Sequence, residues 1–576
     1  MLDHLVRGVT VVDGTGRPAY VADVGLRDGR IAVIGAVTED ARTSEDASGL
    51  VLAPGFVDPH THYDAQLFWD PYATPSLNHG VTTVAAGNCG FTLAPLNPGR
   101  PDDADYTRRM MSKVEGMSLV ALEEGAPWSW SGFGEYLDAL EGRIAVNAGF
   151  MVGHCALRRY VMGPDAVGGQ PSEAQLADML RLFHEAMDAG AWGFSTTQSS
   201  THSDGDGKPV ASRHALPAEL IALSQAVGEH EGTQIEAIVA GCLDQFSDDE
   251  IDLFVEMSAV AGRPLNWNVL TIDSAVPARV PRQLEASERA RKAGGRVVAL
   301  TMPILTPMNM SLGTFCALNL IPGWGPVLGL PVPERIARLG DPAVRAELVR
   351  RGRSEEAGVF RRLTDFGRYV IGDTYSAANE GLTGRVVQDI AAERGLDPFS
   401  CLVEICVADE LRTVLWPMPT DNDPASWALR AETWRHEDVL LGGSDAGAHL
   451  DRMCGAPYTT RFLGDCLRGR RLVSLERAVQ MLTDDPARLF GLRERGRIEE
   501  GFHADLVLFD PERIDAGKAT LVHDLPGDSP RLDSKALGIT AVWVNGVEAI
   551  RGDTVTGAVP GRVLRSGRDT ATVSTK

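Results

Sequence analysis

The chain has 576 residues, which is long for one ordinary domain, although a barrel with additions accommodates most of that length. Its hydrophobic fraction of 44% and charged fraction of 23% are typical of a soluble globular protein with an ample core. The formal net charge of −23 disfavours nucleic acid and anionic membranes as partners, because both would repel the chain.

The eight cysteines are scattered and form no CxxC pair, a pattern that favours reduced thiols over a disulfide framework. The first residues contain no basic segment followed by an apolar core, so no secretory signal is predicted. No uninterrupted apolar run reaches membrane-spanning length. We therefore expect a cytoplasmic protein.

Residues 1–54 are predicted to form short strands, because alternating apolar residues are separated by Asp-Gly turns. Segments of similar character return near the C-terminus, at 504–509 and 539–547. Neither terminal piece alone has enough strands for an independent core. We predict that residues 1–54 and 497–566 pair into one small composite β-sandwich.

Between these terminal pieces, buried-strand and helix patterns alternate, which indicates an α/β fold. The predicted strands are 56–59, 81–86, 145–152, 191–195, 234–239, 264–270, 296–302 and 438–443. The clearest helix covers 172–189, where Ser172 and Gln175 form a capping box before one apolar face. This alternation predicts a (β/α)8 TIM-like barrel over 55–496, with a doubly wound open sheet as the alternative.

A long segment separates the seventh and eighth predicted strands. Its second half contains predicted helices at 383–394, 401–415 and 424–436. Connections of this length in a compact domain are usually functional lids or small subdomains. We therefore predict an inserted cap subdomain at 303–380.

His60 and His62 follow the first predicted barrel strand directly. Residues two apart in an extended chain project to the same side, so both imidazoles can contact one object. Two converging neutral imidazoles suit a transition-metal ion. The alternative is a pair of surface histidines in a loop, since this short pattern is common.

Ligand-type side chains also follow the second and eighth predicted strands, at Cys89 and Asp445. Strand eight lies beside strand one in a closed barrel, so Asp445 is expected near the two histidines. An aspartate there binds a metal through one oxygen and accepts a proton from water through the other. Alternatively, Cys89 is a small buried hydrophobic residue and Asp445 is a helix N-cap.

Several motifs resemble the amidohydrolase superfamily and, within it, the D-aminoacylase (N-acyl-D-amino-acid deacylase) branch. The matching segments are 53–64, 70–71, 79–90, 153–158, 193–196, 443–445, 475–492 and 495–505. The resemblance covers most of the chain and implies a β-sandwich plus barrel that hydrolyses an amide with zinc-activated water. The oligomeric state stays open, and a homo-oligomer is compatible with the resemblance.

The metal ligands of the family are matched only in part. Many amidohydrolases bridge two metals with a carboxylated lysine on strand four, whereas the D-aminoacylase branch uses a cysteine after strand two. The only lysine between residues 113 and 292 is Lys208, in a polar loop, so Cys89 fits the cysteine route. The family also places histidine ligands on strands five and six, but no histidine lies between His230 and His436.

The remaining ligands form one four-ligand site, made of His60, His62, Cys89 and Asp445, which favours one zinc over two. If all four residues bind, no position stays open unless the coordination geometry expands. Glu236, on the fifth predicted strand, is a further candidate ligand, since a buried carboxylate needs a partner. Its alternative role is an inward polar residue bonded to a neighbouring strand.

Other residues are predicted to contact the substrate. Asn266 and Asn268 share one face of the sixth predicted strand, and His154 and Arg158 follow the third. A structural role for His154 is the alternative. Arg452 is predicted to pair with a substrate carboxylate in the bidentate way that arginine favours, with a solvated salt bridge as the alternative.

The sequence therefore predicts a metal-dependent amidohydrolase acting on an N-acyl D-amino acid or a related small-molecule amide that carries a carboxylate. In this hypothesis Asp445 accepts a proton from the attacking water and then protonates the leaving nitrogen. A second hypothesis keeps the fold but gives the reduced site a non-hydrolytic reaction, such as elimination or isomerisation, or ligand binding. A third is a hydantoinase-like cyclic amide hydrolase, which the missing lysine disfavours.

Overall fold

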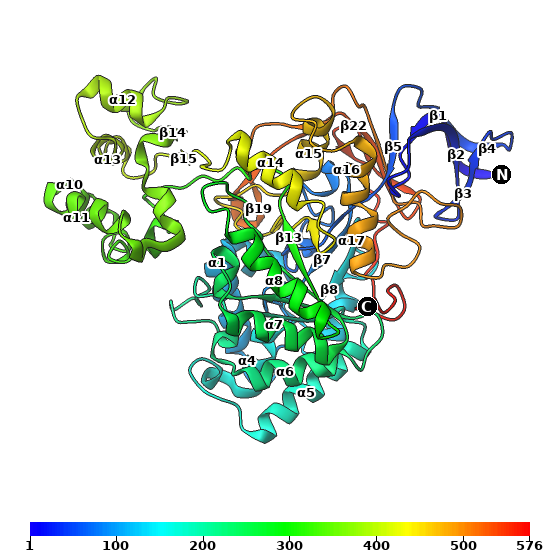
Figure 1. Ribbon diagram of the computed structural model, residues 1–576, viewed down its shortest axis with the longest axis horizontal. Helices are drawn as coiled ribbons and strands as arrows, with labels where there is room; N and C mark the ends of the chain where they lie inside the picture. Colours follow the sequence, from blue (N-terminus) through cyan, green and yellow to red (C-terminus); the bar gives the residue numbers. More distant parts are fainter. Residues whose placement is uncertain (576) are drawn as a thin grey trace. The chain divides into compact units, whose positions relative to one another are not determined.

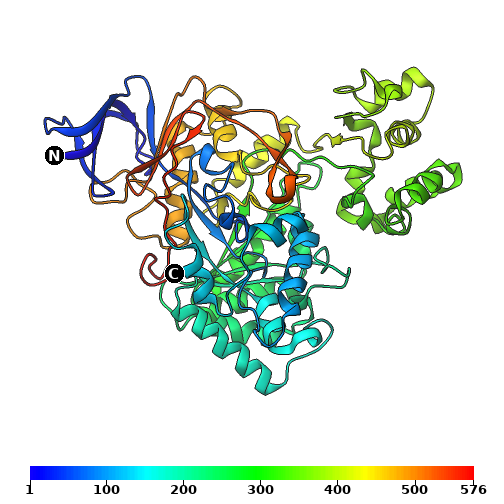
Figure 2. The same ribbon diagram turned by 180° about the vertical axis from the view of Figure 1, so that it is seen from behind.

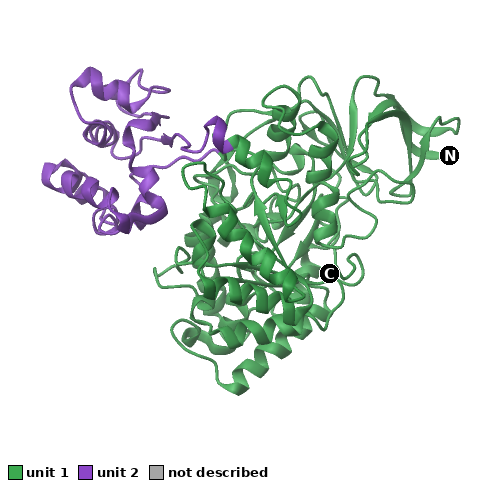
Figure 3. Cartoon of the chain, viewed as in Figure 1, with its two compact units in different colours: residues 1–306, 427–576 green, residues 307–426 purple. Residues whose placement is uncertain are grey.

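A computed structural model describes residues 1–575, and the chain divides into two compact units (Figure 3). Unit 1 comprises residues 1–306 together with the chain from 427 onward, and unit 2 comprises residues 307–426. Unit 2 begins near the start of the predicted cap but extends well beyond residue 380. Among residues 1–575, no helix is both long and apolar enough to cross a membrane.

Parallel strands form the centre of unit 1, and each of the eight predicted barrel segments contains such a strand. They are β6 (Phe56–Asp58), β7 (Val81–Ala86), β8 (Asn147–Phe150), β9 (Val152–Gly153), β10 (Gly193–Thr197), β11 (Gln234–Ile238), β12 (Pro264–Trp267), β13 (Arg296–Thr301) and β16 (Val439–Leu441). One sheet has the order β6-β7-β8 and the other the order β16-β13-β12-β11-β10-β9. The predicted α/β class is therefore confirmed.

Backbone hydrogen bonds connect the edges of these two sheets. At one edge, the Met151 amide donates to the Ala86 carbonyl at 3.0 Å, and Trp192 donates to Phe150 at 2.7 Å. At the other edge, the His62 amide donates to the Ala446 carbonyl at 2.7 Å, just beyond β16. The carboxyl end of β6, where His60 and His62 lie, is thereby held beside the carboxyl end of β16.

Helices follow most of these strands. They are α1 (Asp102–Glu115), α2 (Leu119–Gly125), α3 (Phe133–Leu140), α4 (His154–Met162), α5 (Glu173–Asp188), α6 (Pro217–Val227), α7 (Asp248–Ala261), α8 (Arg279–Lys292), α15 (Tyr458–Leu467), α16 (Leu475–Leu482) and α17 (Asp484–Leu489), with α14 (Pro424–Thr433) crossing into unit 2. Helices α4 to α8 lie side by side in chain order (Figure 1). Helix α5 begins with the predicted capping box of Ser172 and Gln175.

Strands from both chain ends form one nine-stranded sheet, in which blue N-terminal strands lie beside the C-terminal segments (Figure 2). Its order is β24-β23-β22-β17-β5-β1-β2-β3, with β4 paired to β1. These strands are β1 (Leu2–Val11), β2 (Tyr20–Arg27), β3 (Arg30–Gly35), β4 (Ala41–Asp46), β5 (Val51–Pro54), β17 (Leu506–Phe509), β22 (Ile539–Val544), β23 (Val547–Arg551) and β24 (Thr554–Val555). Two short hairpin-like pairs also occur: β18 (Asp515–Ala516) with β21 (Ala536–Leu537), and β19 (Thr520–Leu525) with β20 (Ser529–Asp533).

Unit 2 is mainly helical and has its own hydrophobic core, which includes the buried Trp324, Phe366 and Phe399. Its elements are α9 (Gly325–Leu328), α10 (Val332–Gly340), α11 (Pro342–Gly352), β14 (Tyr369–Ile371), α12 (Val387–Arg394), α13 (Pro398–Ala408) and β15 (Leu415–Pro417). The helix predicted over 401–415 ends at Ala408 instead. The chain then passes through two residues with positive φ and pairs as β15 with β14.

Candidate metal centre

The four side chains predicted to bind a metal lie together in unit 1. Ligand atoms of His60, His62 and Cys89 lie within 4.8 Å of one another, and all three residues are buried. Asp445 Oδ1 lies 3.3 Å from Nε2 of His60 and 3.9 Å from Nε2 of His62. Cys89 Sγ lies 3.5 Å from the same His60 nitrogen. A carboxylate oxygen and a sulfur thus lie beside His60 Nε2.

The backbone around this cluster adopts conformations that most residues avoid. Cys89 and Asp445 have φ values of +55° and +51°, in the left-handed region. Such conformations persist only where the surrounding structure enforces them, and they concentrate at functional sites. Gly447 has a φ of +90°, and a Cβ at this position would lie 2.6 Å from the carbonyl carbon and oxygen of His62. Glycine therefore permits the segment after β16 to approach the histidine strand.

Burial disfavours the charged form of each ligand side chain in the metal-free cluster. It raises the pKa of Asp445 to about 7, with a smaller contribution from Asp58, and raises the pKa of the Cys89 thiol well above its ordinary value. It also lowers the pKa of His62 to about 3. A divalent cation would offset the negative charges of the ionised thiol and carboxylate in this buried place.

The donor set fits a zinc ion. Imidazole nitrogen, thiolate sulfur and carboxylate oxygen are the ligands that Zn²⁺ takes in proteins. The Nε2 atoms of His60 and His62 face Asp445, whereas their buried Nδ1 atoms have no hydrogen-bond partner among the described residues. Both rings are therefore oriented with one nitrogen toward the cluster and the other away from it.

Glu236, the predicted additional ligand, borders the cluster from β11. Its Oε2 accepts a hydrogen bond from the Cys89 amide at 2.7 Å, while Oε1 lies 4.0 Å from Cys89 Sγ and 3.9 Å from His60 Nδ1. Burial raises its pKa to about 8. The carboxyl group thus holds the cysteine turn in place, and one of its oxygens stays close to two ligand residues.

The two asparagines predicted to contact substrate occupy different environments. Asn268 donates to Asp445 Oδ1 at 2.9 Å, so it belongs to the cluster. Asn266 is fully buried, and its amide group contacts the side chain of Gln234 at 3.3 Å and the carbonyl of Ile235 at 3.2 Å. The Asn266 side chain therefore bonds to the neighbouring strand β11.

His154 and Arg158 form a buried network with a third residue, Glu219. His154 Nε2 lies 2.7 Å from one carboxylate oxygen of Glu219, and Arg158 donates to the other at 2.5 Å. His154 Nδ1 also contacts the Thr196 hydroxyl at 2.9 Å. Because both ring nitrogens of His154 and the charges of Arg158 and Glu219 already have partners, this geometry favours the structural role that the sequence left open for His154.

Arg452 lies against the end of α1. A Cβ on Gly116, which follows this helix, would lie 2.9 Å from the Arg452 guanidinium and 2.7 Å from Asp451 Oδ1. Arg452 Nε lies 3.7 Å from the Asp451 carboxylate, beyond direct hydrogen-bond distance. The guanidinium therefore keeps capacity to pair with another anion.

Glu115 was not anticipated from the sequence. It is the last residue of α1, only 2% exposed, and its Oε1 lies 3.7 Å from His62 Nδ1. Its Oε2 lies 3.9 Å from Nε2 of His449, which the sequence analysis did not single out. A carboxylate at a helix C-terminus opposes the helix dipole, which is the one sequence signal that could have drawn attention to it.

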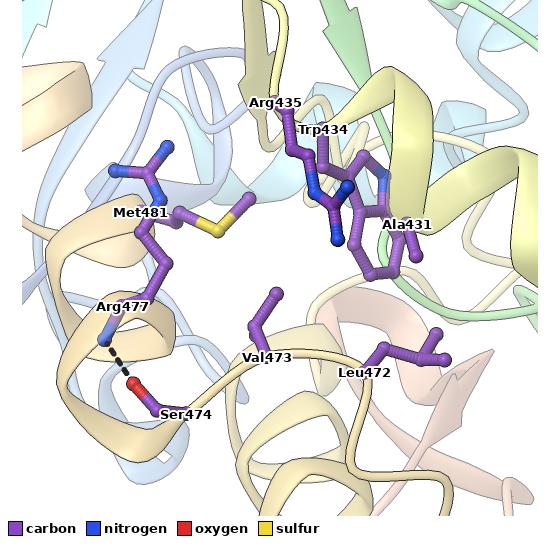
Figure 4. A pocket seen from close by; sticks show the side chains of 8 residues that line it. All are labelled: Ala431, Trp434, Arg435, Leu472, Val473, Ser474, Arg477 and Met481. Carbon is purple, nitrogen blue, oxygen red and sulfur yellow. Dashed lines mark hydrogen bonds between the residues drawn. The ribbon is translucent and has the colours of Figure 1, made fainter.

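A separate cavity of about 440 Å³ contains none of the predicted site residues. Its lining comes from the end of α14 and from α16 with the segment before it: Ala431, Trp434, Arg435, Leu472, Val473, Ser474, Arg477 and Met481 (Figure 4). The Ser474 hydroxyl accepts a hydrogen bond from the Arg477 amide at 3.3 Å, so it serves as the N-cap of α16. This cavity is therefore distinct from the histidine cluster.

Comparisons with known proteins agree with the motifs. The amidohydrolase family model matches residues 44–550. A D-aminoacylase from Alcaligenes xylosoxydans xylosoxydans is 31% identical over 98% of this chain and 97% of its own length. Two solved structures, each with a TM-score of 0.65, cover 98% of this chain and all of their own. One concerns the binuclear metal center of D-aminoacylase (27% identical), and the other is N-acyl-D-glutamate deacylase from Bordetella bronchiseptica with zinc and a phosphonate inhibitor (26%). The predicted D-aminoacylase branch is confirmed, and the chain belongs to the amidohydrolase family.

Proposed function

We propose that this protein is a zinc-dependent hydrolase that cleaves the amide bond of N-acyl-D-amino acids. The observation that carries the proposal is the buried cluster of His60, His62, Cys89 and Asp445 at strand ends. Its donor set suits one zinc ion, and the full-length relatives are deacylases of this substrate class.

The proposal includes a closed (β/α)8 barrel over 55–496, carrying a composite β-sandwich made from 1–54 and 497–566. The hydrogen bonds that join the two parallel sheets at both edges support this closure. Active sites of such barrels lie at the carboxyl ends of the strands, which is where the cluster lies. We further propose that residues 303–380, which fall largely in unit 2, act as a cap subdomain.

A zinc ion held by His60, His62, Cys89 and Asp445 would act as a Lewis acid, activating water and polarising the amide carbonyl. Asp445 then accepts a proton from the attacking water and delivers it to the leaving nitrogen as the C–N bond breaks. Burial raises the pKa of Asp445 to about 7 in the metal-free protein, and a bound zinc ion would lower it, so the carboxylate would be ionised and able to accept the proton near neutral pH. Asn268 holds Asp445 by donating to Oδ1, which leaves the other carboxylate oxygen for the proton.

Arg452 is the proposed partner of the substrate carboxylate. An N-acyl amino acid carries its carboxylate one carbon from the scissile nitrogen, so the cation must lie near the metal cluster. Arg452 lies against the end of α1, whose last residue, Glu115, lies 3.7 Å from a His62 nitrogen. A guanidinium there can hold the carboxylate through two parallel hydrogen bonds.

The test combines elemental analysis of the purified protein with assays on paired N-acyl-D- and N-acyl-L-amino acids. We expect close to one equivalent of zinc and release of the free amino acid from the D substrates. Loss of activity on chelation and recovery with zinc would connect the two measurements.

A protein that takes up no zinc after growth with added zinc, and whose His60→Ala variant is as active as wild type, would contradict the metal-dependent reaction. A zinc-loaded protein that hydrolyses none of these amides would contradict the substrate assignment while leaving the metal site standing.

A further inference from the structure

We propose that Glu115 is a positioning residue, which orients His62 for metal binding by accepting a hydrogen bond from the far nitrogen of its ring. This inference rests on the metal site of the proposed function, and it is independent of which amide the protein hydrolyses. Glu115 does not match any segment that carried the family resemblance.

The geometry places Glu115 behind His62 as seen from the cluster. The His62 Nε2 atom faces Asp445 Oδ1 at 3.9 Å, while Nδ1 on the other side of the ring faces Glu115 Oε1 at 3.7 Å. This second distance is longer than a hydrogen bond. However, Nδ1 is buried and has no hydrogen-bond partner among the described residues, so Glu115 is the acceptor toward which it points.

Metal binding at one ring nitrogen determines what the other must do. A neutral imidazole whose Nε2 holds a metal carries its proton on Nδ1, and a buried N–H needs an acceptor. Carboxylates commonly fill this role behind metal-binding histidines, where they fix the ring and raise its basicity. A small rotation of the His62 ring or of the Glu115 side chain would close the remaining gap.

The surrounding structure holds the Glu115 carboxylate in place although its charge is costly there. It is buried at the end of α1, and its backbone carbonyl accepts a hydrogen bond from the amide of His449, a residue with a φ of +52°. Its second oxygen lies 3.9 Å from His449 Nε2. A buried carboxyl at a helix C-terminus is unfavourable both for desolvation and for the helix dipole. Such a residue is best explained by a function at the site it borders.

The experiment compares three variants with wild type by zinc competition against a chromogenic chelator and by the absorption spectrum of the cobalt-substituted protein. Glu115→Gln keeps an acceptor oxygen but removes the charge, whereas Glu115→Met keeps only the approximate shape. Asp103→Asn is the matched control, because Asp103 is another buried carboxyl of α1 but bonds to Arg159 at 2.7 Å.

We expect zinc affinity to fall about 10-fold in Glu115→Gln and about 100-fold in Glu115→Met, with zinc stoichiometry unchanged. The cobalt spectrum should change in both variants and stay as in wild type for Asp103→Asn. Thermal unfolding of the metal-free proteins separates this role from a purely structural one, which would lower stability without this ranking of affinities.

Zinc affinities of both Glu115 variants within about twofold of wild type, with unchanged cobalt spectra, would overturn the inference. Loss of one zinc equivalent in Glu115→Gln would also overturn it, because Glu115 would then be a ligand. If wild type binds no metal, both this inference and the proposed function fail. If wild type binds zinc but hydrolyses no N-acyl-D-amino acid, only the proposed substrate fails, and the affinity ranking still decides the role of Glu115.

Discussion

Individual residues of the metal centre are held in states that would be unfavourable elsewhere in the chain. Asp445 combines a left-handed backbone with a buried carboxyl that accepts a hydrogen bond from the Asn268 side chain.

 Strain and desolvation of this kind persist where the fold over-determines them, which is typical of catalytic positions. The cost is offset when a metal ion or a substrate supplies the missing charge.

Asp445→Asn tests the proposed proton transfers. The amide keeps the size of the side chain and one ligand oxygen but cannot accept the proton of the attacking water. We expect kcat/KM to fall by about 10² to 10⁴-fold, the usual contribution of a positioned acid or base. Steady-state kinetics on zinc-loaded protein measure this change, and zinc content is determined on the same samples. Activity within threefold of wild type (about 0.7 kcal/mol) would contradict the assigned role.

Zinc affinity should depend on pH in a direction fixed by the ligands. In the metal-free protein the pKa of Asp445 is raised to about 7, so below that pH a proton competes with the metal. We expect the apparent zinc dissociation constant to rise about tenfold per unit of falling pH above about 7, where the Cys89 thiol loses its proton on binding, and about a hundredfold per unit below about 7, where Asp445 loses one as well. Chelator competition at several pH values measures the slope. A slope that does not steepen below about pH 7 would contradict a protonated metal-free Asp445.

The proximity of the four proposed ligand residues could be predicted because they follow strands directly. A histidine pair, a cysteine between glycines and an aspartate after the last strand are local patterns, and the strand order brings them together. Glu115 could not be found in this way, because its position depends on how α1 packs against the segment around His449. The partner of His154, Glu219, lies 65 residues away on another helix, and no local pattern connects the two.

At the scale of elements, the approach of the segment after β16 to β6 brings Asp445 to the two histidines of the candidate metal centre. Gly447 permits this approach because it has no side chain. A Cβ at this position would lie 2.6 Å from the carbonyl carbon and oxygen of His62. We expect Gly447→Ala to lower the free energy of unfolding by about 2 to 4 kcal/mol, from backbone strain and steric overlap together. Zinc content should fall as well, because the overlap displaces His62.

Gly501→Ala is the control for Gly447→Ala, since Gly501 has nearly the same φ, +92°, but open space where its Cβ would lie. In Gly501→Ala the free energy of unfolding should fall only by the cost of the left-handed conformation, about 1 to 2 kcal/mol, and the variant should keep its zinc. Chemical denaturation and metal analysis of both variants make the comparison. Equal effects of the two substitutions would show that the close approach carries no extra cost.

The parallel strands were predictable to within a few residues, because short apolar runs bounded by turns or helices recur along the chain. The helix predicted over 401–415 was too long, since Glu410 and Leu411 both adopt positive φ and end the helical path before β15. Composition alone does not reveal such a turn, because neither residue is glycine or asparagine. Tertiary packing in unit 2 decides where this helix ends.

At the scale of the whole molecule, the two ends of the chain are joined in one sheet. Strand β5 pairs with β17, and Arg551 on β23 donates to both carboxylate oxygens of Glu45 on β4, at 2.8 and 3.2 Å. Pairing segments so far apart in the sequence carries a loop-closure entropy cost that the contacts of the sheet must offset. The sheet therefore links the stability of the N-terminal strands to that of the C-terminal strands.

Glu45→Gln tests this link through pH. Hydrogen bonds from His4 and then Arg551 lower the pKa of Glu45 to about 2, from an ordinary value of 4.5. A lowered native pKa stabilises the fold above the unfolded pKa, and this contribution is lost as the pH falls from about 4.5 toward 2. We expect Glu45→Gln to cost about 1 to 2 kcal/mol at pH 7, less than the full shift implies because the groups are partly exposed.

The difference between wild type and Glu45→Gln should shrink steadily as the pH is lowered through 4 and toward 3, because protonation of Glu45 makes the two proteins alike. Urea unfolding at each pH measures it, with Asp40→Asn as a control at an exposed carboxyl of the same end of the chain. A difference that stays constant with pH would mean that Glu45 contributes through its shape alone. A difference that grows on acidification would have the wrong sign for a lowered native pKa, and the ion pair joining β4 to β23 would then be no source of stability.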